Sequence, residues 1–150
     1  MQLDSQWVVG FVDGEGCFHV GINANATMIQ KRQVLPEFVV VQHIRDINVL
    51  YALKDYFQCG VVRVNHGDRM AYRVRGFDHL RHKIIPFFEK HQLKTKKRVD
   101  FERFRDIILL MERKMHLTSE GILKIQKIAN QMNTKAYKIV DEPKIESSSY

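Results

Sequence analysis

The chain has 150 residues, of which 45% are apolar, and this proportion is typical of one folded globular domain rather than a disordered or fibrous chain. Its 24 lysines and arginines outnumber its 17 aspartates and glutamates, and the formal net charge of +7 favours nucleic acid or another acidic partner. Apolar runs are too short to span a membrane, no signal peptide is visible, and two cysteines are too few for a disulfide scaffold, so we expect neither membrane association nor secretion.

A short helix and two strands are predicted in the first third of the chain. The helix covers residues 6–12, with Ser5 as its N-cap, and ends at the glycine-rich run Asp13-Gly14-Glu15-Gly16. After this run, apolar and polar side chains alternate with the period of a strand, and a second strand follows a polar turn over residues 25–32. Pro36 in the second strand favours a sheet edge or a bulge.

A second helix and a hairpin follow. Asp46 is expected to cap the helix, and Gly60 to end it. The turn sequence His66-Gly67-Asp68 lies between two alternating runs, residues 61–65 and 70–75, and this arrangement predicts a β-hairpin.

Helices fill the rest of the chain. Asp78 starts a third helix, which Pro86 is expected to kink. A basic loop over residues 94–98 leads into the longest helix, whose apolar stripe is expected to run from Val99 to Met115, and Thr118 caps a final helix that ends near residue 132.

The order α-β-β-α-β-β-α, followed by two further helices, predicts an α+β fold in which a four-stranded antiparallel sheet carries its helices on one face. Residues 1–133 are expected to form a single domain, and residues 134–150 a loosely ordered C-terminal tail.

The second face of this sheet has no helix to cover it, and it is polar. Strand alternation places a set of polar and charged side chains on that face. The set consists of His19, Asn23, Gln33, Glu37, Arg63, Asn65, Arg73 and Arg75. These residue types can read base edges in a major groove, which a β-ribbon fits, whereas the ordinary alternative is a solvated sheet face. Four such strands in a basic chain favour nucleic acid, with Asn25, Lys96 and Lys97 as further DNA contacts.

The segment around Asp13-Gly14-Glu15-Gly16 suggests close packing and metal binding. Gly10 and Gly14 are four residues apart, so they share one face of the first helix and let another helix backbone approach closely. Glu15 lies where the helix meets the first strand, and carboxylate and carbonyl oxygens are the ligands that Mg²⁺ or Ca²⁺ requires. A tight turn with solvated acids is the simpler alternative.

The run V-V-G-F-V-D-G-E-G resembles the signature of the LAGLIDADG homing endonucleases, and the resemblance covers about residues 3–133. The motif occurs once, and single-motif members of this family act as homodimers whose signature helices pack together. The resemblance therefore implies a dimer interface at Trp7, Gly10, Phe11 and Gly14. It also implies that Glu15, with the Gly14 carbonyl beside it, binds Mg²⁺ at the scissile phosphates, where Ca²⁺ or Mn²⁺ can take the same place.

Two more catalytic positions follow from the resemblance. Gln42, at the end of the second strand, falls where the family often has a polar residue that positions the attacking water. Lys94 falls at the family's basic residue near the scissile phosphate, where it would stabilise developing negative charge. For Lys94, a solvated loop or a plain phosphate contact is the alternative.

The function implied is a homodimeric, site-specific DNA endonuclease of intron homing, which cuts both strands of a long, near-palindromic site. An organelle, either chloroplast or mitochondrion, or a microbial cytoplasm is the expected location. Three alternatives remain open on the same fold: a group I intron RNA maturase, a DNA-binding regulator that does not cleave, and one half of a two-motif protein.

Overall fold

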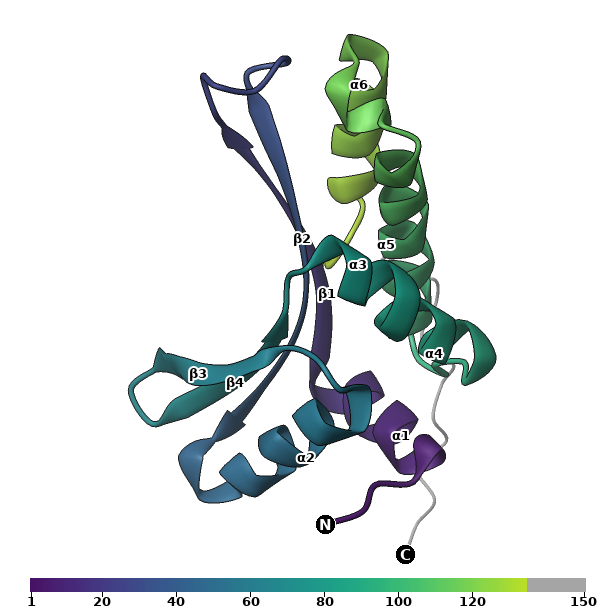
Figure 1. Cartoon of the computed structure of the whole chain (residues 1–150). Helices are drawn as coiled ribbons and strands as arrows, with labels where there is room; N and C mark the ends of the chain where they lie inside the picture. Colours follow the sequence, from purple (N-terminus) through teal and green to yellow (C-terminus); the bar gives the residue numbers. More distant parts are fainter. Residues whose placement is uncertain (135–150) are drawn as a thin grey trace, which may run out of the picture.

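Residues 1–134 are described by the computed structural model, and they form two helix–hairpin units followed by a layer of helices (Figure 1). The tail expected over residues 134–150 lies outside the described residues, apart from Thr134. The elements are α1 Ser5–Glu15, β1 Gly16–Ala24, β2 Arg32–His43, η1 Ile44–Asp46, α2 Ile47–Phe57, β3 Val61–His66, β4 Arg69–Val74, α3 Phe77–His79, η2 Leu80–Ile84, α4 Ile85–Lys90, α5 Lys97–Glu112, η3 Met115–Leu117 and α6 Ser119–Ala129.

The four strands form one antiparallel sheet in the order β1-β2-β4-β3, so the predicted α+β fold is confirmed. Gly16 of β1 lies opposite Val40 of β2, and Val40 in turn lies opposite Tyr72 of β4. Strand β4 pairs with β2 only from Phe38 onward, so residues 32–37 form a sheet edge, and Pro36 lies in that edge as expected. In Figure 1 helices α3 to α6 lie along one side of the β1–β2 ribbon.

Phenylalanines from the sheet and from the helices form the centre of the core. Phe18 of β1 lies 5.2 Å from Phe38 of β2, 5.5 Å from Phe88 of α4 and 5.4 Å from Phe104 of α5, measured between ring centroids. All four side chains are buried, and their separations are those of favourable aromatic pairs. The core therefore fixes α4 and α5 against the helix-covered face of the sheet, and the opposite face stays open.

Helix α1 is longer than the sequence predicts at both ends. Asp4, not Ser5, is its N-cap, because the Asp4 Oδ1 accepts hydrogen bonds from the backbone N–H groups of Gln6 (2.8 Å) and Trp7 (3.3 Å). At the other end the helix continues through Gly14 to Glu15, and Gly16 enters the extended conformation of β1. The acid of the signature motif is thus the last residue of the helix.

The boundaries of the other helices also differ from expectation. Asp46 makes no side-chain capping bond to α2, and it belongs to the 3₁₀ turn η1, which the imidazole of His43 caps. Pro86 lies in the first turn of α4, and the π-helical segment η2 precedes it, in which the Ile85 N–H donates to the Leu80 carbonyl. A wide turn is a common way for a helix to accommodate a proline.

Thr118 caps α6 as predicted, because its hydroxyl accepts the Gly121 N–H at 2.9 Å. The helix ends at Ala129, three residues before the expected end. Across residues 1–134, no helix has the length and apolar character needed to cross a bilayer.

Candidate functional site

The C-terminus of α1 presents exposed oxygen atoms. Glu15 is the last residue of the helix and is exposed. Since the helix ends here, the Gly14 carbonyl has no donor in a following helical turn. A carboxylate at the negative end of a helix dipole is unfavourable unless a cation lies nearby. This end of α1 is therefore suited to a hard divalent cation.

One copy of the chain supplies only part of a metal site. Over the described part of the chain, no group of three histidine, cysteine, aspartate or glutamate side chains comes together to hold a metal ion. Glu15 and a neighbouring carbonyl fit Mg²⁺ chemically, because this ion is commonly bound by one or two carboxylates together with waters and substrate phosphates. The remaining ligands must come from outside the protomer.

Asp13 ties the end of α1 to the loop before α5. Its Oδ2 accepts the backbone N–H of Lys94 at 2.9 Å. Its Oδ1 accepts the backbone N–H of Thr95 at 3.2 Å and the Thr95 hydroxyl at 2.8 Å. Asp13 thus has a structural role in this chain, and Glu15 is left as the acid available to a ligand.

Three lysines in the loop before α5 and at the start of that helix lie in different surroundings. The Lys97 amine donates to the carbonyl of Gly16, the residue after Glu15. The Lys96 amine lies 3.4 Å from both carboxylate oxygens of Asp100. Lys94 donates a hydrogen bond from its backbone N–H, whereas its side-chain amine makes none within residues 1–134. The structure therefore brings the side chain of Lys97 to the α1–β1 junction, although the sequence pointed to Lys94 for catalysis and to Lys97 for DNA contact.

A buried acid, Asp100, lies close to the α1–β1 junction and binds the end of the described chain. The Asp100 side chain is 5% exposed, and its Oδ1 accepts the backbone N–H of Asn133 at 3.1 Å. The Asn133 amide donates to the Phe18 carbonyl at 2.7 Å, which fastens the end of the described chain to β1. Cys17 lies beside Asn133, and burial raises the pKa of its thiol, as expected of a structural thiol and not of a nucleophile.

Gln42 lies at the same end of the sheet. It is half-buried on β2 and pairs with Met70, two residues beyond Val40, which lies opposite Gly16. Strand alternation gives Gln42 the same direction as the buried Val40, toward the side of the sheet that the helices cover. The structure thus places Gln42 within two strand residues of the α1–β1 junction.

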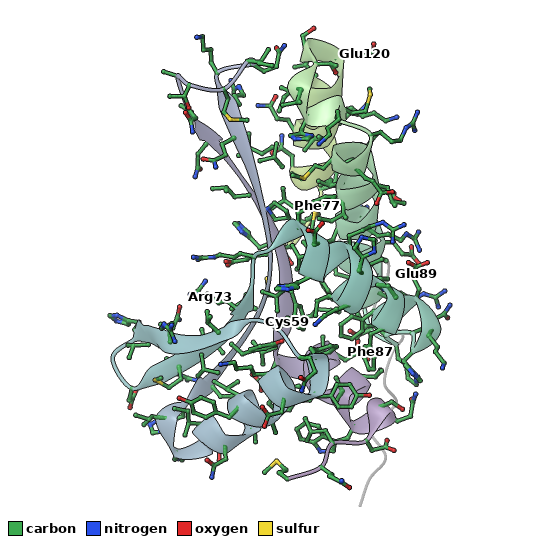
Figure 2. The ribbon with its side chains drawn as sticks, viewed as in Figure 1. Cys59, Arg73, Phe77, Phe87, Glu89 and Glu120 are labelled. Carbon is green, nitrogen blue, oxygen red and sulfur yellow. The ribbon has the colours of Figure 1, made fainter. Side chains whose placement is uncertain are left out.

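The polar side chains predicted for the open sheet face lie on that face, with one refinement at Asn65. His19 lies opposite Glu37, and Asn23 lies opposite Gln33. Asn65 occupies a bulge between β3 and β4, a register irregularity that the sequence pattern did not show. The remaining members of the set, Arg63, Arg73 and Arg75, come from the β3–β4 hairpin and the residue that follows it, and Figure 2 shows Arg73 on the hairpin.

Asn25 has a clear structural role in the turn between β1 and β2. Its Oδ1 accepts the backbone N–H of Thr27 at 3.0 Å and the Thr27 hydroxyl at 2.6 Å. Its amide nitrogen lies 3.3 Å from the Gln33 side-chain oxygen. The amide groups of this residue are therefore partly engaged before any DNA contact.

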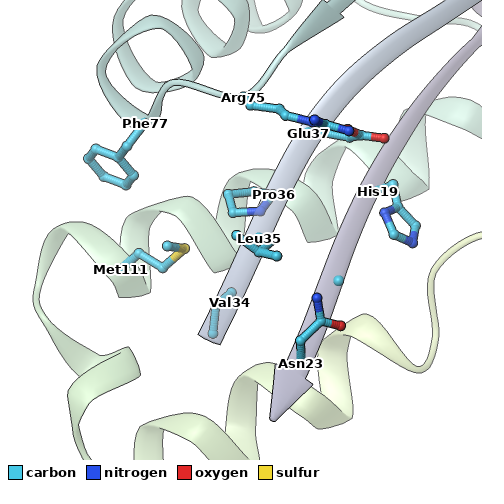
Figure 3. Close-up of a pocket in the computed structure, with 10 residues that line it drawn as sticks. His19, Asn23, Val34, Leu35, Pro36, Glu37, Arg75, Phe77 and Met111 are labelled. Atoms are coloured by element: carbon cyan, nitrogen blue, oxygen red, sulfur yellow. The ribbon is translucent and has the colours of Figure 1, made fainter. Parts of the chain in front are cut away.

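Glu37 pairs with two arginines of the open face. Its Oε1 accepts from Arg73 Nη1 at 3.0 Å, and its Oε2 accepts from Arg75 Nε at 2.7 Å. Figure 3 shows Arg75 and Glu37 lying against each other beside a hollow of about 470 Å³. His19, Asn23 and exposed Leu35 line the same hollow. The sequence could not show that this acid is already paired.

An apolar stripe on α1 remains uncovered. Trp7 is 43% exposed and stacks on Phe11, with ring centroids 4.8 Å apart. Gly10 and Gly14 belong to the same stripe, and a Cβ built on either one meets no atom within 4 Å. Because Val8, Val9 and Val12 on the other side of the helix are buried, the stripe faces away from the protomer's own core.

Comparison with known proteins identifies close similarity over most of the chain. Residues 8–108 match the model of the LAGLIDADG endonuclease family. The probable intron-encoded endonuclease 3 of Neurospora crassa is 31% identical over 131 residues, which are 85% of this chain and 24% of that protein. The chain spans about a quarter of the length of the first curated relatives that it matches.

Two solved structures share the fold. The crystal structure of the homing endonuclease I-TnaI is 60% identical, with a TM-score of 0.87 over 91% of this chain and 92% of that one. I-SmaMI bound to an uncleaved DNA target in the presence of calcium ions is 32% identical, with a TM-score of 0.85 over 87% of this chain and 45% of that one.

Asp13→Ala is expected to release the loop before α5. The substitution removes the acceptor for the Lys94 and Thr95 amides, and hydrogen bonds to a charged group contribute about 1.5–3 kcal/mol. We expect hydrogen exchange at these two amides to accelerate roughly 10- to 100-fold, as measured by NMR. Asp4→Ala is the matched control, because it should affect Gln6 and Trp7 at the other end of α1 and leave the loop protected. Unchanged exchange at Lys94 and Thr95 in Asp13→Ala would contradict the assignment.

Proposed function

The chain belongs to the LAGLIDADG endonuclease family, and on that basis we propose that two copies of it form a site-specific DNA endonuclease that makes a metal-dependent double-strand break at a long, near-palindromic site. The observation that carries the proposal is the position of Glu15, an exposed acid at the end of a helix whose outer stripe is uncovered. Residues 1–133 would act as one domain.

Intron homing is the biological role that we propose. Curated relatives are named as intron-encoded endonucleases, and one from Podospora anserina is named for its place in ND4 intron 1. We accordingly place the activity in a chloroplast or mitochondrion, or in a microbial cytoplasm.

Glu15 and the Gly14 carbonyl are the residues that would hold the metal ion. Mg²⁺ is the expected ion, with Ca²⁺ or Mn²⁺ able to occupy the same positions, and the presence of calcium ions with the I-SmaMI complex on uncleaved DNA supports divalent metal use. When bound, such ions polarise the scissile phosphate and the attacking water. The ligands that one copy lacks would be supplied by the DNA, by water and by the second copy.

Lys97 and Gln42 would act beside the metal ligands. The Lys97 amine lies at the junction that carries Glu15, where a positive charge stabilises the charge that develops on a phosphate during cleavage. Gln42, at the neighbouring strand end, would orient the attacking water. Lys94 remains a predicted member of this group, although its backbone alone is engaged in the protomer.

The open sheet face would lie in the major groove. Strand β1 has nine residues and spans about 30 Å, or roughly nine base pairs at ~3.4 Å each, so two copies would cover a site of about twenty. Lysines and arginines would supply affinity through phosphates, while the side chains of the face would select the sequence. Asn25, Lys96 and Lys97 remain predicted DNA contacts.

Glu15→Gln is expected to lower cleavage at least about a thousandfold while DNA affinity stays within about threefold, because the substitution removes a metal ligand but keeps the shape of the side chain. Single-turnover cleavage with Mg²⁺, with and without EDTA, measures the effect on a library of intron-insertion sites. Glu120→Gln is the control, since it makes the same change on α6 at the far end of the molecule (Figure 2). Wild-type cleavage by Glu15→Gln, or cleavage in EDTA, would contradict the metal assignment, and binding of group I intron RNA without DNA cleavage would favour the maturase alternative.

Lys97→Met is expected to slow the chemical step about 10²- to 10³-fold, because it removes the amine at the α1–β1 junction. Lys94→Met makes the same chemical change three residues earlier, in the loop before α5, and should slow cleavage less than about tenfold, as expected for a phosphate contact. Rapid-quench kinetics at saturating protein separate these effects from binding. The opposite ranking of the two variants would assign the catalytic role to Lys94.

Gly10→Leu is expected to weaken association of two copies about 5- to 150-fold, because a side chain in a tightly packed interface costs roughly 1–3 kcal/mol. The protomer itself should fold at least as well, since nothing in it meets a Cβ at this position and glycine is a poor helix former. Sedimentation equilibrium measures association, with Asn48→Leu on the exposed side of α2 as control. Equal association of both variants would place the interface elsewhere.

A further inference from the structure

The ion pairs of Glu37 divide the charged residues of the open face into two kinds. The Glu37 side chain is only 15% exposed, and each of its carboxylate oxygens accepts a hydrogen bond from an arginine. Because it is so little exposed, this carboxylate presents little surface to a cytosine amine. Glu37 is therefore arranged to hold other side chains in place.

Arg73 and Arg75 differ in how many of their hydrogen-bond donors are free. Arg73 is 22% exposed and donates from Nη1 to Glu37 and from Nη2 to the Asn65 side-chain oxygen at 2.5 Å. Arg75 is 68% exposed and donates to Glu37 only through Nε. Within the described residues, both terminal nitrogens of Arg75 lack a protein acceptor, so its outer edge keeps four N–H donors.

We propose that Arg75 reads a guanine in the major groove and that Glu37 is the positioning residue that orients it. The proposal rests on the DNA-cleaving function proposed above. Guanine presents its O6 and N7 acceptors side by side, which matches the two terminal nitrogens of a guanidinium group. The bond from Nε fixes the plane of that group before DNA arrives, so less side-chain freedom is lost on binding.

The acid itself argues for a base contact over a phosphate contact. A carboxylate on a surface that meets DNA reduces electrostatic affinity, so beside a simple phosphate contact Glu37 would only be a disadvantage. Beside a base-reading arginine it contributes orientation. Its pairing with two arginines also leaves the cluster with a net positive charge.

The register of the sheet locates the guanine along the half-site. Glu37 lies opposite His19, three residues from Gly16 at the start of β1, which is about 10 Å or roughly three base pairs. Asn23 and Gln33, the other facing pair on these strands, lie four residues farther out. The guanine therefore belongs to the inner part of each half-site.

Selection from a random duplex library tests the proposal. The library is bound in Ca²⁺ buffer, and the bound sequences from wild type, Arg75→Lys and Glu37→Gln are compared base by base. Arg113→Lys, just after α5, and Glu120→Gln, on α6, are matched controls and should leave every preference unchanged. Thermal unfolding of each variant checks that it folds, and Arg75→Lys changes an exposed side chain, so it tests the proposal even if Glu37→Gln is unstable.

We expect one guanine preference in the inner half-site to fall about 5- to 150-fold in Arg75→Lys, the discrimination of a bidentate pair. In Glu37→Gln the same preference should fall by at least about threefold, whereas affinity for unrelated DNA should stay equal or rise, because a negative charge has been removed. Replacing this guanine with 7-deazaguanine should weaken wild type but not Arg75→Lys.

Three results would overturn the inference in distinguishable ways. Uniform weakening of Arg75→Lys on all sequences would make Arg75 a phosphate contact. Loss of a cytosine preference in Glu37→Gln, with the guanine preference intact, would make Glu37 a direct reader of bases. If wild type enriches no sequence at all, the proposed function fails together with this inference.

Discussion

The hydrogen bonds of Asp13 connect the two parts of the chain on which the candidate site depends. They join the C-terminus of α1 to the backbone just before α5, across more than eighty residues of sequence. An acid at the negative end of one helix and lysines at the positive end of another are each unfavourable for the helix that carries them. Asp13 offsets its own unfavourable position by accepting the backbone N–H groups of Lys94 and Thr95. In the described part of the chain, the Glu15 carboxylate accepts no such backbone N–H group, and the Lys97 amine meets no such carboxylate. A cation would complement Glu15, and a phosphate would complement Lys97.

On the open sheet face, too, some charged groups bind other protein groups and others stay available to a ligand. Antiparallel register brings β1, β2 and β4 together so that Glu37 meets Arg73 and Arg75, residues that alternation alone places only on the same face. Asn65, set in the bulge, holds Arg73 from the other side. The face is therefore partly organised in the protomer, while the terminal nitrogens of Arg75 and the exposed imidazole of His19 stay available to a ligand.

Strand alternation and turn chemistry were sufficient to predict the four strands and their polar face, because each of these depends on neighbours in sequence. The order β1-β2-β4-β3 was not predicted, since the pairing of β2 with β4 joins segments that are about thirty residues apart. Helix ends were less predictable, since Asp4 and Ser5 are both good caps and the local pattern cannot rank them. On α5 the buried stripe includes Phe101 and leaves Val99 40% exposed, because the rotation of a helix is decided by what packs on it. The position of the Lys97 amine and the burial of Asp100 depend on contacts with Gly16 and Asn133, which no local pattern reveals.

The partial metal site and the uncovered stripe of α1 would both be completed by association of two copies. Residues 1–134 supply too few side chains for a metal site, and α1 leaves its glycine stripe without a covering surface. Gly14 is the last member of that stripe, and Glu15 follows it directly. Packing of two stripes would therefore bring two acids together at the point where the helices meet, which is unfavourable in isolation. Divalent cations and the phosphates of a bound duplex would remove this repulsion, so assembly, metal binding and DNA binding are expected to favour one another.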